Sequence, residues 1–377
     1  MEKVILIPDS FKGTMSSHEI CSIMRTVILN HYPKCEVISI PVADGGEGSV
    51  DAFLEAVGGE KIYKEVTGPY FGEKVMGYYA VLPDNVAVLE MAAAAALPMV
   101  GDNKNPSKTT TYGVGELLLD AANKGVRKII LGLGGSATND AACGLAAAVG
   151  VRFYNENGET FIPVGGDLDQ VSRIDLSSID SRISGLEITT MCDIDNPFHG
   201  PDGAAYVYGP QKGADSEMVK DLDLKMMKLA EVMKRDCNVD VQSIPGSGAA
   251  GGMGGGMVAF FHSKLQMGIE TVLETVDFPD LLDGVDFVYT GEGRIDGQSL
   301  RGKVVIGVAR EARKKDVRTI AFVGDIADDI DNAYEEGVSA IFSINRVALP
   351  YKMQRPRAKS DLALTLDNLL RYQKCME

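Results

Sequence analysis

The sequence predicts an α/β protein in which one domain is inserted into another. Short strand-like runs alternate with helix-like runs at both ends of the chain, whereas the middle contains several strand-like runs in succession. Glycine and aspartate residues follow most of the predicted strands. Short buried strands that alternate with helices indicate parallel βαβ units, which bind ligands at the carboxyl ends of their strands.

Both ends of the chain show this alternation. The hydrophobic runs there are short and β-rich, and amphipathic segments separate them. The predicted elements are strand Val4–Ile7, helix Ser16–Leu29, strand Glu36–Ile40, helix Ser49–Val57, strand Phe287–Tyr289, helix Lys303–Arg313, strand Thr319–Val323, a short helix near Asn332, strand Ala340–Ile344 and a final helix from about Asp361.

The middle of the chain differs. Residues 62–90 contain strand-like runs with no helix between them, which predicts antiparallel or mixed pairing. We assign residues 1–62 and 286–377 to one discontinuous domain and residues 63–285 to an inserted α/β domain. The elements predicted beyond residue 90 are helix Tyr112–Asn123, strand Lys128–Leu131, a helix over Thr138–Val149, a polar surface excursion over 155–185, strand Thr189–Cys192 and a charged helix over about 215–236.

The negative charge of the chain limits the classes of partner that it can bind. The formal net charge is −16, a sign that repels phosphate backbones and anionic lipids, so we expect no nucleic-acid or membrane partner. The longest apolar run, residues 87–100, contains Glu90 and is too short to span a bilayer. An enzyme of this charge that binds anionic substrates needs local cations, helix N-termini or metal ions at its site.

The six cysteines form no CxxC pair, which predicts reduced thiols and neither a disulfide framework nor a zinc site. The N-terminal residues run directly into a predicted strand and lack the pattern of a signal peptide. We therefore expect a cytoplasmic protein.

Six predicted strands end in an acidic residue beside glycine or another turn-forming residue. One such loop could arise by chance, but six indicate that the loops share a crevice. The loops cover residues 8–13, 43–48, 132–140, 193–197, 290–297 and 324–325.

This residue combination suits phosphoryl transfer. Glycines let backbone N–H groups approach phosphate oxygens, and carboxylates hold Mg²⁺. Gly134–Ser136 lead into the helix predicted from Thr138, where a helix dipole would add positive charge. The glycine-rich run 245–256 precedes the apolar segment Val258–Phe261, which favours a close-packed helix start over a flexible linker. Each of these features also has an ordinary structural reading, as a turn or a helix cap.

One segment nearly matches a phosphate-binding P-loop. Residues 297–303 fit the pattern GxxxxGK, but Val304 replaces the serine or threonine that would contact Mg²⁺, so we reject this reading. Arg294, Arg301 and Lys303 remain candidates for neutralising anionic groups. The four histidines show no metal-ligand spacing.

At these loops the chain closely resembles the type I glycerate kinases. The matching segments run in order over nearly the whole chain: PDSFKG (8–13), ADGGEGS (43–49), NPSKTTTYGVGELL (105–118), LGGSATNDAACG (133–144), CDIDNPFHGPDGAA (192–205), YGPQKGA (208–214), PGSGAAGGMGGG (245–256) and TGEGRIDGQSLRGK (290–303).

This resemblance implies a Rossmann- or flavodoxin-like domain built from both termini, a second α/β domain inserted into it, and an active site in the cleft between them. It also implies ATP- and Mg²⁺-dependent phosphorylation of D-glycerate, usually to 2-phosphoglycerate. The oligomeric state is left open between monomer and homodimer.

Within the matching loops we assign roles as hypotheses. Asp193 or Asp296 would deprotonate the hydroxyl that is phosphorylated, and Lys12 would neutralise developing charge. The other expected sites are substrate binding by Ser10, Arg294 and Arg301, phosphate binding by Gly134, Gly135, Ser136, Thr138, Gly248, Gly251 and Gly252, and Mg²⁺ binding by Asp44 and Glu47.

Three alternatives are weighed against this hypothesis. A kinase for another small hydroxy acid, or one that forms 3-phosphoglycerate, would use the same loops. A ligand-binding regulator without turnover would not need the carboxylates that hold Mg²⁺, so their abundance counts against it. A dinucleotide-dependent oxidoreductase is disfavoured, because no GxGxxG pattern follows the first predicted strand.

Overall fold

A computed structural model of the chain describes residues 1–42, 45–297 and 299–376. It confirms the predicted α/β fold class, with one parallel sheet and one mixed sheet. The chain divides into two compact units, the first formed by Met1–Asp44, Glu55–Val57 and Met267–Glu377 and the second by Gly45–Leu54 and Gly58–Gln266. The domain boundaries expected after residue 62 and before residue 286 do not coincide with these limits and stay a prediction.

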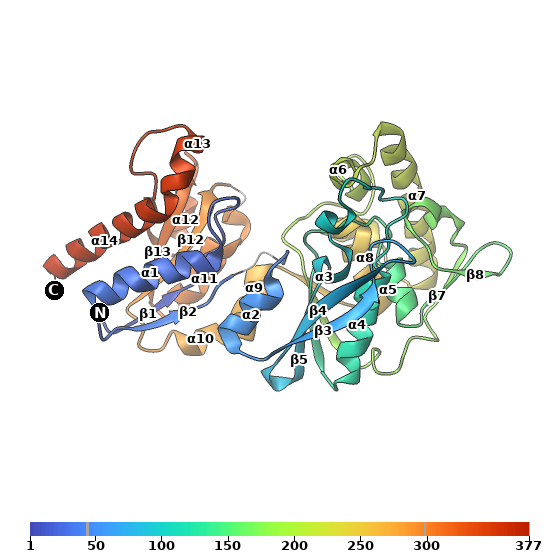
Figure 1. Cartoon of the computed structure of the whole chain (residues 1–377), viewed down its shortest axis with the longest axis horizontal. Helices are drawn as coiled ribbons and strands as arrows, with labels where there is room; N and C mark the ends of the chain where they lie inside the picture. The colour runs from blue at the N-terminus through green and yellow to red at the C-terminus, as the bar shows by residue number, and fades with distance from the viewer. Residues whose placement is uncertain (43–44, 298, 377) are drawn as a thin grey trace. The chain divides into compact units, whose positions relative to one another are not determined.

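The first unit contains a five-stranded parallel sheet made from both ends of the chain. The blue strands β1 and β2 and the orange strands β12 and β13 share this sheet in Figure 1. The order is β14-β13-β12-β1-β2, which is the flavodoxin-like order once the strands are counted along the chain. The strands are β1 (Lys3–Leu6), β2 (Glu36–Ser39), β12 (Phe287–Ile295), β13 (Arg318–Ile326) and β14 (Val338–Ser343).

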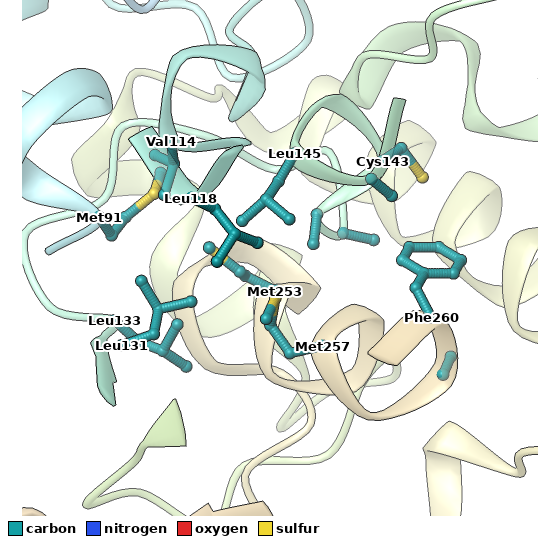
Figure 2. Packing of buried hydrophobic residues seen from close by; sticks show 14 of the residues in the cluster. Met91, Val114, Leu118, Leu131, Leu133, Cys143, Leu145, Met253, Met257 and Phe260 are labelled. Atoms are coloured by element: carbon teal, nitrogen blue, oxygen red, sulfur yellow. The ribbon is translucent and has the colours of Figure 1, made fainter. Parts of the chain in front are cut away.

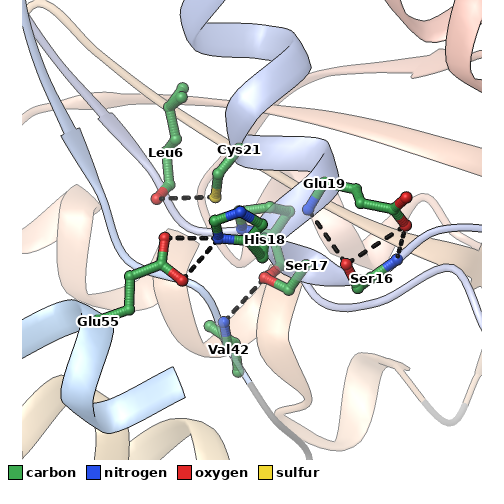
Figure 3. Close-up of polar contacts among 9 residues, drawn as sticks. Leu6, Ser16, Ser17, His18, Glu19, Cys21, Val42 and Glu55 are labelled. Atoms are coloured by element: carbon green, nitrogen blue, oxygen red, sulfur yellow. Dashed lines mark hydrogen bonds and ion pairs between the residues drawn. The ribbon is translucent and has the colours of Figure 1, made fainter. Parts of the chain in front are cut away.

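Apolar side chains at helical spacing build the helices of this unit. In α1, Ile20, Met24 and Ile28 are buried one turn apart. Ser16 caps its first turn: Ser16 Oγ accepts from Glu19 N, and Ser16 N donates to Glu19 Oε2 (Figure 3). The helices are α1 (Ser17–His31), α9 (Gly268–Thr275), α10 (Phe278–Leu281), α11 (Val304–Lys314), α12 (Asn332–Glu335), α13 (Tyr351–Gln354) and α14 (Ala358–Met376), and α2 (Ser49–Val57) belongs to both units.

The second unit contains a six-stranded mixed sheet of order β11-β10-β6-β5-β4-β3. The pairs β3–β4 and β4–β5 are antiparallel, as expected for residues 62–90, and the remaining pairs are parallel. The strands are β3 (Glu60–Thr67), β4 (Lys74–Leu82), β5 (Val86–Glu90), β6 (Lys128–Gly132), β10 (Glu187–Met191) and β11 (Lys264–Gln266).

A large apolar core fills this second unit. Figure 2 shows Met253 and Met257 of α8 lying beside Leu131 of β6, Leu118 of α4 and Leu145 of α5. All five side chains are almost completely buried. The helices are α3 (Ala92–Ala95), α4 (Tyr112–Asn123), α5 (Cys143–Ala148), α6 (Ala204–Tyr208), α7 (Ser216–Asp236) and α8 (Ala249–Phe261).

Three local predictions are wrong. The helix expected from Thr138 begins only at Cys143, because Ala141 and Ala142 adopt left-handed backbone angles. Strand β12 continues through Ile295, so residues 290–295 form strand and not loop, since β13 extends equally far and pairs with it. The expected surface excursion over 155–185 contains the strands β8 (Thr160–Phe161) and β9 (Arg173–Asp175), which form a small three-stranded sheet with β7 (Arg152–Tyr154).

Candidate active site

The strand order of the first unit reverses between β1 and β12. Ligands of open parallel sheets bind at such a switch point, beyond the carboxyl ends of the two strands. The chain stays against β12 after β1 ends, because Ile7 N donates to Tyr289 O at 2.9 Å and Asp9 N donates to Gly291 O at 2.8 Å. The residues that follow therefore have fixed positions beside the end of β12.

The turn after β1 presents Ser10 and Lys12. Phe11 and Met15 are buried and exchange backbone hydrogen bonds of 2.9 and 3.0 Å, which closes the turn. A Cβ on Gly293 would lie 3.6 Å from Phe11 Cα and 3.7 Å from Lys12 N, so the turn packs closely on β12. The Lys12 side chain is exposed and Ser10 is half-buried.

Charged side chains cluster where β12 and β13 end together. The Arg294 guanidinium lies 3.8 Å from Asp296 Oδ2 and 3.7 Å from Asp325 Oδ2. Asp296 N–H donates to Ser299 Oγ at 3.1 Å, which starts the turn leading to α11. The side chain of Arg301, a predicted substrate residue, lies outside the described part of the structure, whereas the predicted substrate residue Arg294 lies beside the predicted catalytic residue Asp296.

Glu292 is a buried carboxyl at the same strand end. Its side chain is 6% exposed, and Oε1 has no hydrogen-bond partner among the described residues. Burial raises the pKa of Glu292 to about 7. A hydrogen bond with Ser299 and the charge of Lys303 lower this pKa, whereas the charges of Asp9 and Asp296 raise it further.

In the second unit, the carboxyl ends of three parallel strands are level with one another. Gly132 of β6 is in register with Glu90 of β5 and with Met191 of β10. The turn after β6 is fixed by main-chain bonds to the segment after β5: Leu97 N donates to Gly135 O at 2.7 Å, and Ala137 N donates to Ala95 O at 3.0 Å.

Glu90 connects this strand end to the turn before α2. Its carboxylate is 1% exposed and accepts from Val50 N at 2.6 Å and from the Tyr78 hydroxyl at 3.1 Å. Burial raises the pKa of Glu90, and the Val50 bond opposes that shift. A carboxylate at a helix N-terminus satisfies backbone donors and favours the helix dipole. Glu90 therefore fixes where α2 begins.

The residues before α2 reach the turn after β6. Gly134 N donates to Gly45 O at 2.9 Å, and a Cβ on Gly134 would lie 2.3 Å from Gly46 Cα, so only glycine permits this approach. Glu47, a predicted Mg²⁺ ligand, is exposed beside these glycines. Asp44, the other predicted ligand, lies outside the described residues.

The glycine-rich run 245–256 packs its backbone against two of these loops. Gly251 has a φ of +72°, and a Cβ there would lie 2.1 Å from Thr138 O. A Cβ on Gly248 would lie 2.1 Å from Pro197 O. The N–H groups of Gly248 and Gly252 donate to Asn196 O and Gly248 O. These contacts give the glycines a close-packing role, while phosphate binding by Gly248, Gly251 and Gly252 stays a prediction.

Ser136 and Thr138 are both buried inside the turn after β6. Ser136 Oγ accepts from Thr138 N at 3.1 Å and lies 3.2 Å from Thr138 Oγ1. Lys212 is 2% exposed, and its Nζ donates to Thr138 O at 2.7 Å. Burial lowers the pKa of Lys212 to about 7, and the charge of Asp140 opposes that shift.

Asp140 ends the turn and is completely buried. Its Oδ2 accepts from Thr111 N at 2.7 Å and Thr111 Oγ1 at 2.9 Å. Burial raises the pKa of Asp140 to about 6, although these bonds lower it. Because Asp140 and Lys212 hold the turn at its end and its middle, Gly134, Gly135, Ser136 and Thr138 form one fixed structure.

Asp193 follows β10 at the same edge of the sheet. The loop is anchored by the preceding residue, whose N–H donates to Gln266 O at 2.9 Å. Burial raises the pKa of the Cys192 thiol to about 11, and the charge of Asp193 adds to this shift. Asp193 itself is half-buried. Its catalytic role stays a prediction, as does the expected convergence of turns from both units in one cleft.

Comparison with known proteins identifies the family. A sequence model of the glycerate kinase family matches residues 4–374. This chain belongs to the glycerate kinase family. A glycerate kinase from Halalkalibacterium halodurans is 43% identical over 346 residues, covering 91% of each chain. The Escherichia coli glycerate 2-kinase is 40% identical over 344 residues, covering 91% of this chain and 90% of the relative.

The fold is also that of a solved glycerate kinase family structure. A crystal structure described as a glycerate kinase 2 from Salmonella typhimurium LT2 superimposes with a TM-score of 0.86 at 37% identity, and covers 99% of this chain and 98% of that one. The resemblance inferred from the loop motifs is thereby confirmed.

Sequence reasoning gave no role to Glu90, Glu292, Asp140 and Lys212. A signal was present for two of them. Glu90 interrupts an apolar run, and Glu292 stands between glycines after a buried strand. Burial of an ionisable group at a strand end indicates a functional or positioning role. Nothing in the local sequence of Lys212 shows that it is buried, because its partner Thr138 lies far away along the chain.

Proposed function

We propose that this protein transfers the γ-phosphoryl group of ATP to D-glycerate and forms 2-phosphoglycerate. The observation that carries the proposal is the match of residues 4–374 to the glycerate kinase family, together with relatives above 40% identity over about nine tenths of the chain. The E. coli relative is a glycerate 2-kinase, which favours the 2-hydroxyl as the acceptor.

In the proposed reaction the glycerate hydroxyl oxygen attacks the γ-phosphorus, and the bond from that phosphorus to the bridging oxygen of ADP breaks. The hydroxyl proton passes to the carboxylate of Asp193 or Asp296. Positioning and charge stabilisation supply most of the catalysis of such a transfer. Both carboxylates follow strand ends, where a substrate can reach them.

The cations at the switch point of the first unit suit a small anionic substrate. Arg294 and Lys12 are exposed beside the ends of β12 and β1. In a chain of net charge −16, such local cations are needed to attract glycerate or ATP. We assign binding of the glycerate carboxylate to Arg294 with Ser10 and Arg301, and neutralisation of the transferred phosphoryl group to Lys12.

The turn after β6 in the second unit suits phosphate. Gly135 has a φ of +77° and is exposed, so its backbone can approach a ligand closely. Gly134, Ser136 and Thr138 belong to the same turn, which Lys212 fixes from beneath at the Thr138 carbonyl. We propose that this turn, with Gly248, Gly251 and Gly252, holds the ATP phosphates.

We assign Mg²⁺ to Asp44 and Glu47. Among the described residues, no group of three or more histidine, cysteine, aspartate or glutamate side chains could hold a metal ion. In a kinase, Mg²⁺ is held by one or two carboxylates together with phosphate oxygens and water. When bound, Mg²⁺ would neutralise phosphate charge. Glu47 lies directly before α2, whose start is set by Glu90.

We further propose that the protein acts in the cytoplasm, as a monomer or homodimer. All six cysteines are free, as expected in a reducing compartment. In the described part of the chain, no helix combines the length and apolar character needed to cross a membrane.

The test is ³¹P NMR of the product formed from D-glycerate, ATP and MgCl₂. Phosphorus on the oxygen of C2 couples to a single proton and gives a doublet, whereas phosphorus on the oxygen of C3 couples to a pair of protons and gives a triplet. A doublet supports the proposal, and a triplet would replace 2-phosphoglycerate by 3-phosphoglycerate. No organic phosphate from D-glycerate, but ADP release with another hydroxy acid, would assign a different substrate.

A further inference from the structure

We propose that Glu292, which has no assigned role, is a positioning residue of the active site: its ionised carboxylate holds the turn that carries Asp296 through Ser299. This inference rests on the proposed kinase function, and it deepens that function by adding a group that sets the reactive geometry. Three geometric observations support it.

The first observation is the place of Glu292 in the sheet. It lies near the carboxyl end of β12, beside the reversal of strand order between β1 and β12. Arg294 and Asp296 follow it on the same chain segment. A buried ionisable group at the carboxyl end of a strand beside such a switch point indicates a functional or positioning role.

The second observation is the contact with Ser299. The Ser299 side chain is 1% exposed and accepts the N–H of Asp296 at 3.1 Å, and a hydrogen bond from Ser299 lowers the pKa of Glu292. The Ser299 carbonyl then accepts from Gly302 N at 3.1 Å and Lys303 N at 3.2 Å. Ser299 therefore bonds the backbone of Asp296, Gly302 and Lys303 and also acts on the carboxyl group of Glu292.

The third observation is the unsatisfied oxygen. Oε1 of Glu292 is buried and has no hydrogen-bond partner among the described residues. A buried acceptor left unpaired destabilises the fold, so a carboxylate at this position needs a reason besides packing. A glutamine or a leucine of similar size would avoid burying a charge.

The charged groups around Glu292 come from several elements. Asp9 belongs to the segment after β1, Asp296 to the turn after β12, and Lys303 precedes α11. Arg294 and Asp325 pair nearby, at the ends of β12 and β13. Ser299 and Lys303 favour the ionised form of Glu292, and Asp9 and Asp296 oppose it. The ionisation of Glu292 therefore depends on the residues that form the site.

The first experiment compares kcat across pH 5.5–9 for the wild type and Glu292→Gln. In the wild type we expect kcat to rise through the ionisation of Glu292. The glutamine has the same shape but cannot ionise, so this rise should vanish and kcat above it should fall by about 10²-fold, the effect of a misplaced reactive group. Glu292→Asp should recover part of kcat and keep the rise.

The second experiment shifts the pKa of Glu292 by replacing neighbouring residues instead of Glu292 itself. Removing the Ser299 hydroxyl takes away a bond that lowers the pKa of Glu292, so Ser299→Ala should shift the rise in kcat to higher pH. Asp9→Asn removes a charge that raises the pKa, so it should shift the rise to lower pH. Each shift should be on the order of one pH unit. These opposite signs could not come from a general loss of stability.

A readout without substrate separates this inference from the proposed function. Hydrogen exchange of the amides of residues 299–303 should be faster in Glu292→Gln than in the wild type. Asp361→Asn is the matched control, because Asp361 is 5% exposed in α14 of the same unit and its carboxylate pairs with Arg357. It should change neither exchange of this turn nor the pH profile.

Unchanged exchange of residues 299–303 in Glu292→Gln, or a wild-type pH profile in that variant, would overturn the inference. A wild type that does not phosphorylate D-glycerate would instead overturn the proposed function, and the exchange measurement would still decide the role of Glu292. If Glu292→Gln does not fold, Ser299→Ala tests the same contact.

Discussion

The two units hold their candidate site residues in different ways. In the first unit, the exposed Arg294 stands at the end of β12 and pairs with Asp296 and Asp325, and the exposed Lys12 lies in the turn after β1. In the second unit, the turn after β6 is held by close backbone packing against Gly251 and by the buried groups Asp140 and Lys212.

This difference predicts which substitutions each unit tolerates. An exposed charge at a strand end can be removed with little loss of packing, because surface ion pairs contribute at most about 1 kcal/mol. A backbone contact that needs glycine, or a buried charge, cannot be changed without a large loss of stability. We therefore expect variants of the exposed strand-end charges in the first unit to lose activity, and variants of the packed glycines and buried charges in the second unit to lose stability.

The largest effect expected is on turnover, in Asp296→Asn. Asparagine keeps the shape of the side chain but cannot accept the hydroxyl proton or supply its negative charge. If Asp296 is the base, kcat should fall by about 10²–10⁴-fold. The melting temperature should stay close to that of the wild type, because the side chain lies at a partly exposed strand end. Steady-state kinetics and thermal unfolding check both parts.

Asp283→Asn is the control for that variant. Asp283 is an exposed aspartate of the same unit that pairs with Lys315 at 3.0 Å, and its replacement should leave kcat unchanged. Wild-type turnover in Asp296→Asn would remove Asp296 from catalysis and leave Asp193 as the candidate base.

The largest stability effect is expected in the second unit, for Gly256→Ala. The new Cβ would lie 2.0 Å from Ala141 O and 2.8 Å from Ala142 Cβ, so α8 and the turn before α5 would have to separate. We expect a loss of about 3 kcal/mol in the free energy of unfolding, despite the better helix propensity of alanine. Urea denaturation measures it.

Gly185→Ala is the matched control, because no heavy atom of the described residues beyond its chain neighbours lies within 4 Å of the Cβ it would add. Its stability should stay within about 0.5 kcal/mol of the wild type. Equal stability of the two variants would contradict the view that α8 and the 134–142 turn are packed backbone to backbone.

The stability of the second unit should depend on pH because Lys212 is buried. Lys212 has a folded pKa of about 7 and an unfolded value of 10.5, so between these values the unfolded state binds more protons. Stability must then rise with pH through this window. Between pH 7 and 8.5 the titration of Lys212 should raise the free energy of unfolding by about 1–2 kcal/mol. In Lys212→Met this rise is absent, so the difference from the wild type should change with pH.

Urea titrations of both proteins at several pH values measure that difference. Lys234→Met is the control, because Lys234 is exposed and pairs with Asp240 at 2.6 Å. Its stability should run parallel to that of the wild type over the same range. A constant difference between the wild type and Lys212→Met would mean that Lys212 is not the titrating group.

Much of the fold was predictable because periodicity and turn residues act locally. The alternation of strands and helices at both ends predicted β1, α1, β13 and α11, and the motif order predicted the family. The helix expected from Thr138 was wrong because Asp140, buried against Thr111, holds the chain in a turn. That contact joins residues far apart in sequence, so no local pattern reports it.

The same reason limits what the sequence says about the site. It singled out the loops, because acidic residues and glycines gather there. It could not separate a glycine that approaches a ligand from one that approaches protein backbone, as Gly251 approaches Thr138. Nor could it show that Glu292 and Lys212 are buried, since burial depends on how distant segments pack.

The smallest effect expected is in the first unit, at the start of α1. Ser16 Oγ accepts from Glu19 N at 3.2 Å, and Glu19 Oε2 accepts from Ser16 N at 3.0 Å (Figure 3). Ser16→Ala removes the first of these bonds and leaves an N–H group of the first turn without its side-chain acceptor. The free energy of unfolding should fall by about 1 kcal/mol, with kcat unchanged.

Thr26→Ala serves as its control, since Thr26 lies within the same helix, is exposed, and its hydroxyl donates to Ser22 O at 2.8 Å. Its stability should stay within about 0.5 kcal/mol of the wild type. A loss of turnover in Ser16→Ala at unchanged stability would show that the start of α1 acts on the neighbouring turn with Lys12. That result would contradict the view that, in the first unit, exposed side chains at the strand ends determine activity whereas helix capping and packing determine stability.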